Sequence, residues 1–185
     1  MPPPIPPVNT WLVAPPVPLP VDQAPSPLEI PSTVAWRRVG AESDGLVNLS
    51  REFGPTASPA VVWLKTGMRS HGAQDKSVHL GWARQIWLYV NGKLTYSADN
   101  PFYPEEARLQ VDGRFDQENT TVKIHLNDGN NDIFVAVANR WRTYQGAVKA
   151  SPYGWGVAMS LVETDRAAGI ALMLFPRDAL PRTSW

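Results

Sequence analysis

The chain has 185 residues, and its 17 basic and 17 acidic side chains give a formal net charge of zero at pH 7. Nucleic-acid-binding domains and polybasic membrane-binding surfaces normally carry a basic excess, so this balance argues against both kinds of partner. With 43% hydrophobic and 18% charged residues, the composition is that of a globular protein. No apolar run reaches the length of about 18 residues that a bilayer span needs. The absence of cysteine excludes disulfides, cysteine–zinc sites and thiol catalysis.

Prolines are concentrated in the first part of the chain, where 12 of the 19 precede residue 32. Proline lacks the backbone N–H that a helix or a sheet ladder needs. Residues 1–33 are therefore expected to form an irregular, extended arm, and residues 34–185 the folded domain. Trp11–Val13 and the pair Leu28 and Ile30 are apolar islands within the arm. They leave open whether the arm packs along the domain or forms a free leader.

The arm does not have the composition of a secretory signal. It lacks a basic start, and its prolines interrupt any apolar core. The expected location is the cytoplasm, or an extracytoplasmic compartment if a leader has been removed.

From residue 34 onwards, short stretches rich in β-branched and aromatic residues alternate with glycine, asparagine, aspartate and proline. No segment sustains helical periodicity over about a dozen residues. This pattern predicts an all-β fold of antiparallel strands, either a sandwich or a barrel. The expected strands are Val34–Val39, Ala60–Thr66, Ser77–Leu80, Gln85–Asn91, Lys93–Ser97, Arg108–Val111, Thr120–Leu126, Asp132–Ala138, Trp155–Glu163 and Gly169–Phe175.

Two hairpins are predicted in detail. In the first, Gln85–Val90 runs through Asn91-Gly92 into Lys93–Tyr96, and Asn-Gly favours a tight type I′ turn. Gln85–Val90 is apolar on both faces, which indicates a strand in the interior of a sheet. In the second, Thr120–Leu126 turns through residues 127–131 into the strand that begins near Ile133. The alternating apolar and polar residues of Thr120–Leu126 predict a strand with one buried face and one solvent-exposed face.

Three parts of the sequence carry a resemblance to a known family. They are Trp36–Arg51, Leu88–Asn100, and Asn131–Asn139 followed by the Gly-Trp-Gly of residues 154–156. Together they resemble the galactose-binding-domain-like jelly rolls found in bacterial proteins. They are also similar to the sugar-binding domains that accompany glycoside hydrolases and to many carbohydrate-binding modules. The resemblance covers roughly residues 36–163 and implies a jelly-roll β-sandwich, a fold that hosts binding, adhesion and enzyme-accessory roles alike.

The segment Arg140–Tyr153 departs from these relatives, which have a short glycine-rich link at this place. It is long, basic and aromatic, and loops of this length are uncommon without a function. Sugars are bound by aromatic faces together with carboxylate, amide and guanidinium groups. The predicted ligand site therefore comprises Arg140, Trp141, Tyr144 and Tyr153, with Asp99, Asn100 and Tyr103 nearby.

The alternative for these aromatic residues is that they only cover the ends of the sandwich. Four other tryptophans are expected in the core rather than on a ligand surface. They are Trp36, Trp63, Trp87 and Trp155.

Metal ions and cofactors are not expected. His71, Asp75 and His79 would share one face of an extended strand, but their spacing matches no known ligand motif. The segment Asp128–Asp132 offers oxygen ligands that suit calcium, yet it lies where a turn needs such residues. A structural calcium stays open there because the relatives often hold one.

No catalytic motif stands out, since neither a nucleophile elbow nor a phosphate-binding loop is present. The sequence therefore favours a non-catalytic carbohydrate-binding or carbohydrate-accessory module, with a saccharide or glycan as its partner. One alternative is a protein–protein interaction or structural module whose arm docks on a partner or on a second copy as a homo-oligomer. A small jelly-roll enzyme acting on saccharides is another.

Overall fold

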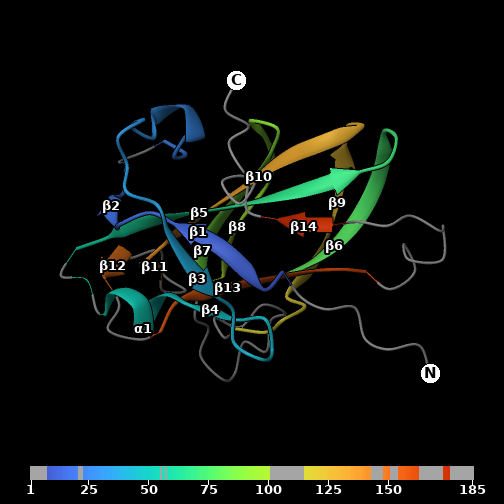
Figure 1. The fold of residues 1–185 in the computed structure, drawn as a ribbon. Coiled ribbons are helices and arrows are strands. Elements are labelled where there is room, and N and C mark those ends of the chain that lie inside the picture. Colours follow the sequence, from blue (N-terminus) through green and yellow to red (C-terminus); the bar gives the residue numbers. More distant parts are fainter. Residues whose placement is uncertain are drawn as a thin grey trace.

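A computed structural model of the chain describes residues 8–20, 23–54, 56, 58–100, 115–142, 148–150, 154–162 and 173–175. The expected strand Arg108–Val111 lies outside these residues. In the described parts the strands form two main antiparallel sheets and one short ribbon (Figure 1). The structure is an all-β sandwich, which confirms the predicted fold class.

The larger sheet, here called sheet A, has the strand order β3-β1-β5-β10-β7-β8. Strands β2 and β14 also pair with β5. Strand β2 pairs near the start of β5 and β14 near its end, and β1 pairs with the residues between them. The strands of sheet A are β1 (Thr10–Val13), β2 (Val17–Pro18), β3 (Arg37–Gly40), β5 (Ala60–Ser70), β7 (Arg84–Val90), β8 (Lys93–Asn100), β10 (Gly129–Ala138) and β14 (Met173–Phe175).

The smaller sheet, sheet B, has the order β4-β13-β6-β9. Its strands are β4 (Val47–Asn48), β6 (Gln74–Trp82), β9 (Thr120–Leu126) and β13 (Gly156–Leu161). The separate ribbon pairs β11 (Arg140–Arg142) with β12 (Val148–Ala150). The helical elements in the described residues are η1 (Pro27–Glu29) and α1 (Leu49–Phe53), and neither has the length and apolar character of a membrane-spanning helix.

The core lies between the two sheets, where the inward-facing residues of both meet. Val62 and Leu64 of β5 and Val78 and Leu80 of β6 are buried in one apolar cluster. The predicted core position of Trp155 is confirmed, because its side chain is 3% exposed in this cluster. Gly156 follows it, and a Cβ there would lie 2.7 Å from the carbonyl oxygen of Val47, so glycine lets β4 approach β13 closely.

A second apolar cluster covers the outer face of sheet A. Trp63 and Trp87 are each 5% exposed there, and Trp36 packs against them while half-buried. The predicted burial is confirmed for Trp63 and Trp87 and only in part for Trp36, and all three lie on the face beside the proline-rich arm, not between the sheets. The arm residues in this cluster are Ala14, Leu19 and Ile30.

The N-terminal arm contains a strand that the proline count did not predict. Thr10–Val13 pairs with β3 on one side and with β5 on the other (Figure 1). The expectation of an arm without regular structure was wrong at this point. The reason is that residues 8–14 contain no proline, so their N–H groups are available for a sheet ladder.

The predicted hairpin between Thr120–Leu126 and the strand near Ile133 was also wrong. Strand β9 pairs with β6 in sheet B, whereas β10 pairs with β5 and β7 in sheet A. Residues 127 and 128 therefore connect the two sheets, and no hairpin closes here. The predicted faces are correct, since Val122, Ile124 and Leu126 are buried and the residues between them are exposed. Both strands offer an apolar face to the same core, and that pattern alone does not specify the sheet.

The hairpin at Asn91-Gly92 forms as predicted. Both residues have positive φ, 51° and 80°, and Val90 pairs directly with Lys93. Strand β7 lies in the interior of sheet A, with Ile86, Leu88 and Val90 in the core between the sheets.

Replacement of Gly92 by valine is expected to reduce the free energy of unfolding by about 1–2 kcal/mol, because valine resists left-handed backbone. The matched control is Gly40→Val. Gly40 has no positive φ, and the nearest atom to a Cβ there is 4.0 Å away. Denaturant unfolding of both variants measures the difference, and equal losses would show that the backbone conformation of Gly92 is not the cause.

Candidate functional site

One end of sheet A brings together polar residues from three strands. Strand β7 begins there with Arg84 and Gln85, and β8 ends there with Asp99 and Asn100. Gln85 pairs with Asp99 on one side and with Ala138, the last residue of β10, on the other. This set of strand ends is called the polar corner below.

On the outer face of the polar corner, Arg140 is paired with Gln85. Nε of Arg140 donates a hydrogen bond of 3.0 Å to Oε1 of Gln85, and Nη2 donates to the same oxygen. Asp99 lies beside Gln85 in the neighbouring strand. All three side chains are half-buried. The corner therefore presents a guanidinium, an amide and a carboxylate at one place.

On the inner face of the same corner, Arg84 and Asn100 close the end of the core. Arg84 is 6% exposed and Asn100 is 1% exposed, and Nδ2 of Asn100 donates a 2.8 Å hydrogen bond to the carbonyl of Trp82. Burial lowers the pKa of the Arg84 guanidinium from its ordinary value. Arg84 also has a φ of 85°, which is uncommon for a residue with a side chain and marks local strain.

Asn139 completes this inner face, one residue beyond the end of β10. It is 1% exposed, and its Nδ2 donates a 2.8 Å hydrogen bond to Oγ1 of Thr56. Within the described residues, Oδ1 of Asn139 and the indole N–H groups of Trp82 and Trp155 have no hydrogen-bond partner.

The structure describes three of the seven predicted ligand residues in full. Arg140 and Asp99 both flank Gln85 on the outer face, whereas Asn100 points into the core and holds the Trp82 carbonyl. Trp141 lies on β11, where the backbone alone is described. Tyr103, Tyr144 and Tyr153 lie outside the described residues.

The segment predicted as one long loop contains a ribbon. Arg140 pairs with Ala150 and Arg142 with Val148, so β11 and β12 form an antiparallel pair that starts at the polar corner.

Sequence reasoning missed Arg84, Gln85 and Asn139. The sequence did offer a signal for Arg84 and Gln85, because they directly precede the apolar run of β7. A strand buried on both faces has polar residues mainly at its ends, where a site can form.

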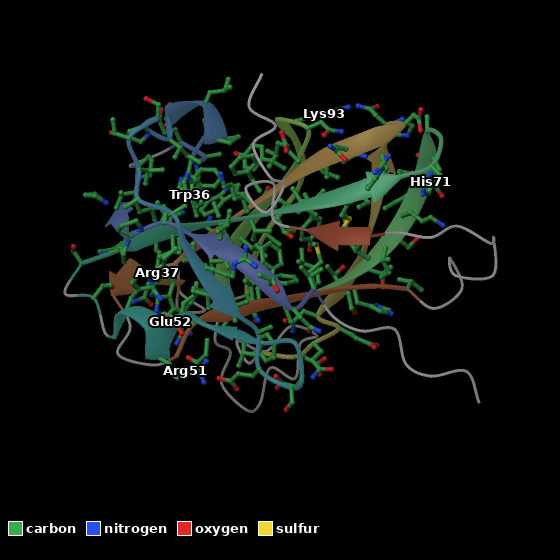
Figure 2. All side chains as sticks on the ribbon, in the orientation of Figure 1. Trp36, Arg37, Arg51, Glu52, His71 and Lys93 are labelled. Atoms are coloured by element: carbon green, nitrogen blue, oxygen red, sulfur yellow. The ribbon has the colours of Figure 1, made fainter. Side chains whose placement is uncertain are left out.

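The residues considered as metal ligands lie on the solvent face of sheet B and in the adjoining turn. Asp75 is within 2.8 Å of Nδ1 of His125 and 3.2 Å from Nζ of Lys123, and these two contacts lower the pKa of the Asp75 carboxyl. Nδ1 of His79 is 3.1 Å from the hydroxyl of Thr121, and His71 lies at the periphery between β5 and β6 (Figure 2). No group of three or more histidine, aspartate or glutamate side chains in the described part of the chain is arranged to hold a metal.

Side chains of the segment Asp128–Asp132, considered as a calcium site, form hydrogen bonds to nearby backbone groups. Oδ1 of Asp128 accepts a 2.7 Å bond from the backbone N–H of Gly72, and Gly129 has a φ of 86°. The side chain of Asn131 is 1% exposed and bonds back to the backbone of Asn127 and Gly129. These contacts hold the short connection after β9 and the first residues of β10 in place.

No family model matches the chain, and no curated protein matches it. Among solved structures, the chain is similar to the crystal structure of a beta-glucosidase from Kluyveromyces marxianus in complex with glucose, at 12% identity and a TM-score of 0.45. The match covers 83% of this chain and 17% of that enzyme, and at this similarity it supports no argument about function. Fold and site together define the chain as an antiparallel β-sandwich protein with a polar corner at one end of its larger sheet.

Proposed function

We propose that the chain is a non-catalytic carbohydrate-binding or carbohydrate-accessory module on a galactose-binding-like jelly roll. Its saccharide would bind at the polar corner. The observation that carries the proposal is the meeting of Arg140, Gln85 and Asp99 on the outer face of three neighbouring strand ends. Rigid strand ends hold such groups more precisely than free loops do.

The chemistry of these groups suits sugar hydroxyls, each of which donates one hydrogen bond and accepts others. Asp99 supplies acceptor oxygens, and Arg140 supplies donors. Arg140 engages the amide oxygen of Gln85, which leaves the Gln85 amide nitrogen as the group that would donate to a hydroxyl. The proposed binding uses no metal ion or cofactor.

The stacking surface in this proposal comes from the aromatic residues joined to the corner. Trp141 directly follows Arg140 in β11, and Tyr103 lies three residues after Asn100. In the sequence, Tyr144 lies between β11 and β12, and Tyr153 follows β12 by three residues. An aromatic face covers the apolar face of a sugar ring, while the polar corner orients its hydroxyls.

The alternative of an interaction module that uses a free arm loses support from the fold. Trp11 and Val13 of the arm are both 0% exposed, and β1 is inserted between two other strands of sheet A. Residues 10–13 of the arm are therefore an integral part of sheet A and not a free docking segment. Self-association through another surface remains a separate hypothesis.

Trp141→Ala and Gln85→Ala are each expected to weaken saccharide binding by about two- to tenfold, since a stacked ring contributes about 0.5–1.5 kcal/mol and a hydrogen-bonding group a similar amount. A glycan array identifies the saccharide, and titration followed by the fluorescence of the eight tryptophans measures its affinity. The matched control is Gln74→Ala. Gln74 is a half-buried glutamine at the opposite end of the sandwich, bonded to Ser70.

Two results would contradict the proposal. One is that no saccharide binds at millimolar concentration. The other is that Gln85→Ala and Gln74→Ala reduce binding equally, which would place the sugar away from the polar corner.

A further inference from the structure

The outer face of sheet A carries a set of aromatic rings beneath the proline-rich arm. The ring centres of Trp63 and Tyr89 are 5.8 Å apart, and those of Trp63 and Phe134 are 6.4 Å apart. Trp36 adds an edge contact to Phe134 at 6.3 Å, and Figure 2 shows it on the arm side of the sheet. These rings form a rigid apolar floor.

The arm is held over this floor by specific bonds. The N–H of Ala14 donates a 2.9 Å hydrogen bond to the carbonyl of Trp63, and the hydroxyl of Tyr89 donates to the carbonyl of Pro25. The N–H of Leu19 donates a 3.2 Å bond to the carbonyl of Pro59. The arm is thus fixed at three points along its length and forms a wall opposite the floor.

A cavity of about 170 Å³ remains between the arm and the sheet. Of the aromatic floor, Trp63 lines this cavity together with Val61, and the arm contributes Pro18 and Pro25 to its walls. Glu29 is the only ionisable side chain among the described residues that line it, and this carboxylate is exposed at the rim. Apolar cavities of about 150 Å³ bind a benzene ring, so this volume accepts one ring with a short substituent.

We propose that this cavity binds a small arylalkyl amine, that is, one aromatic ring with a short primary ammonium arm. The ring lies between the Trp63 indole and the arm prolines, and the ammonium group meets the Glu29 carboxylate. Both the face of an aromatic ring and a carboxylate attract a cation that lies close to them.

The position of the Glu29 charge supports this assignment. Burial raises the pKa of the Tyr89 hydroxyl, and the negative charge of Glu29 raises it further. The negative charge of Glu29 therefore extends to the Tyr89 hydroxyl. At the rim of the cavity the same charge favours a positively charged ligand group.

A sugar is a poor ligand for the same cavity. The hydroxyl of Ser26 already accepts a 3.3 Å bond from the N–H of Leu28, and most of the lining is apolar. A saccharide would bury several hydroxyls here without partners, which costs free energy for each one. The cavity and the polar corner are therefore assigned different ligand classes.

The test uses the full chain and two probes of the same shape, benzylamine and benzyl alcohol. Binding is measured by ligand-observed NMR and by tryptophan fluorescence. Both probes are expected to bind in the millimolar range. Glu29→Gln should weaken benzylamine by about two- to fivefold, the effect of one exposed ion pair, and leave benzyl alcohol unchanged. The matched control is Glu118→Gln on the far side of the sandwich, whose carboxylate is 66% exposed, and it should change neither affinity.

Two further variants make the result decisive. Ile30→Trp, which enlarges a half-buried arm residue at the cavity, should abolish binding of both probes while the melting temperature reports on folding. Gln85→Ala should leave benzylamine binding unchanged, so failure of the saccharide proposal is distinguishable from failure of this one. The inference is overturned if neither probe binds, or if Glu29→Gln and Glu118→Gln have the same effect on benzylamine.

Discussion

Replacement of Trp11 by alanine is expected to lower the free energy of unfolding by about 3–5 kcal/mol, the usual loss for a large aromatic residue removed from a core. Its side chain is 0% exposed in the cluster between the sheets, and its Nε1 donates a 3.0 Å hydrogen bond to the carbonyl of Val8. Because single domains are stable by only about 5–15 kcal/mol, this loss removes a large part of the total.

The control for Trp11→Ala is Leu28→Ala, a change of another apolar residue in the same arm. Leu28 is 89% exposed, so its truncation should alter the unfolding free energy by less than about 0.5 kcal/mol. Denaturant unfolding followed by circular dichroism measures both variants. Similar stability for Trp11→Ala and the unmodified protein would show that the arm is dispensable and that β1 does not pair in solution.

Asn131→Ala is expected to cost about 2–3 kcal/mol, although the side chain removed is small. Its Oδ1 accepts 2.7 Å bonds from the N–H of Asn127 and from Nδ2 of Asn91, and its Nδ2 donates to the carbonyls of Asn127 and Gly129. Alanine would leave these partners without their bonds in a site where Asn131 is 1% exposed. The same side chain joins the connection between the two sheets to the tight turn of the β7–β8 hairpin.

The neighbouring residue provides the control for this prediction. Asn130 is exposed, so Asn130→Ala should leave stability within about 0.5 kcal/mol of the unmodified protein. Thermal unfolding of the two alanine variants compares them directly. If both behave alike, the hydrogen bonds of Asn131 do not stabilise the connection between β9 and β10.

Local sequence patterns predicted those features that depend on neighbouring residues alone. The alternation in Thr120–Leu126 identified the strand and its buried face, and Asn91-Gly92 identified a turn with two positive φ angles. The burial of Trp155 followed from its place at the start of a core strand. In each case the cause is local, because side-chain alternation and backbone sterics act within a few residues.

Among the candidate site residues, the proximity of two was predicted. The segments of Arg140 and Asp99 were expected near each other. The strand register places Asp99 beside Gln85, and a side-chain hydrogen bond joins Arg140 to Gln85. The role of Gln85 itself could not be predicted, because the order of strands β10, β7 and β8 decides which residues meet at their ends. Asn100 was expected to face a ligand, but the pairing of β8 with β7 turns its side chain towards Trp82.

The sequence by itself determined the strands β5 to β10 and β13, the tight turn and the buried faces of these strands, since these follow from local periodicity and backbone preferences. Only the tertiary structure decided that Trp11 enters the sheet, that β9 and β10 lie in different sheets, and that the arm leaves a cavity over Trp63. These features depend on contacts between residues far apart in the chain. Many pairings satisfy the same hydrophobic pattern, and the packing of the whole core selects one of them.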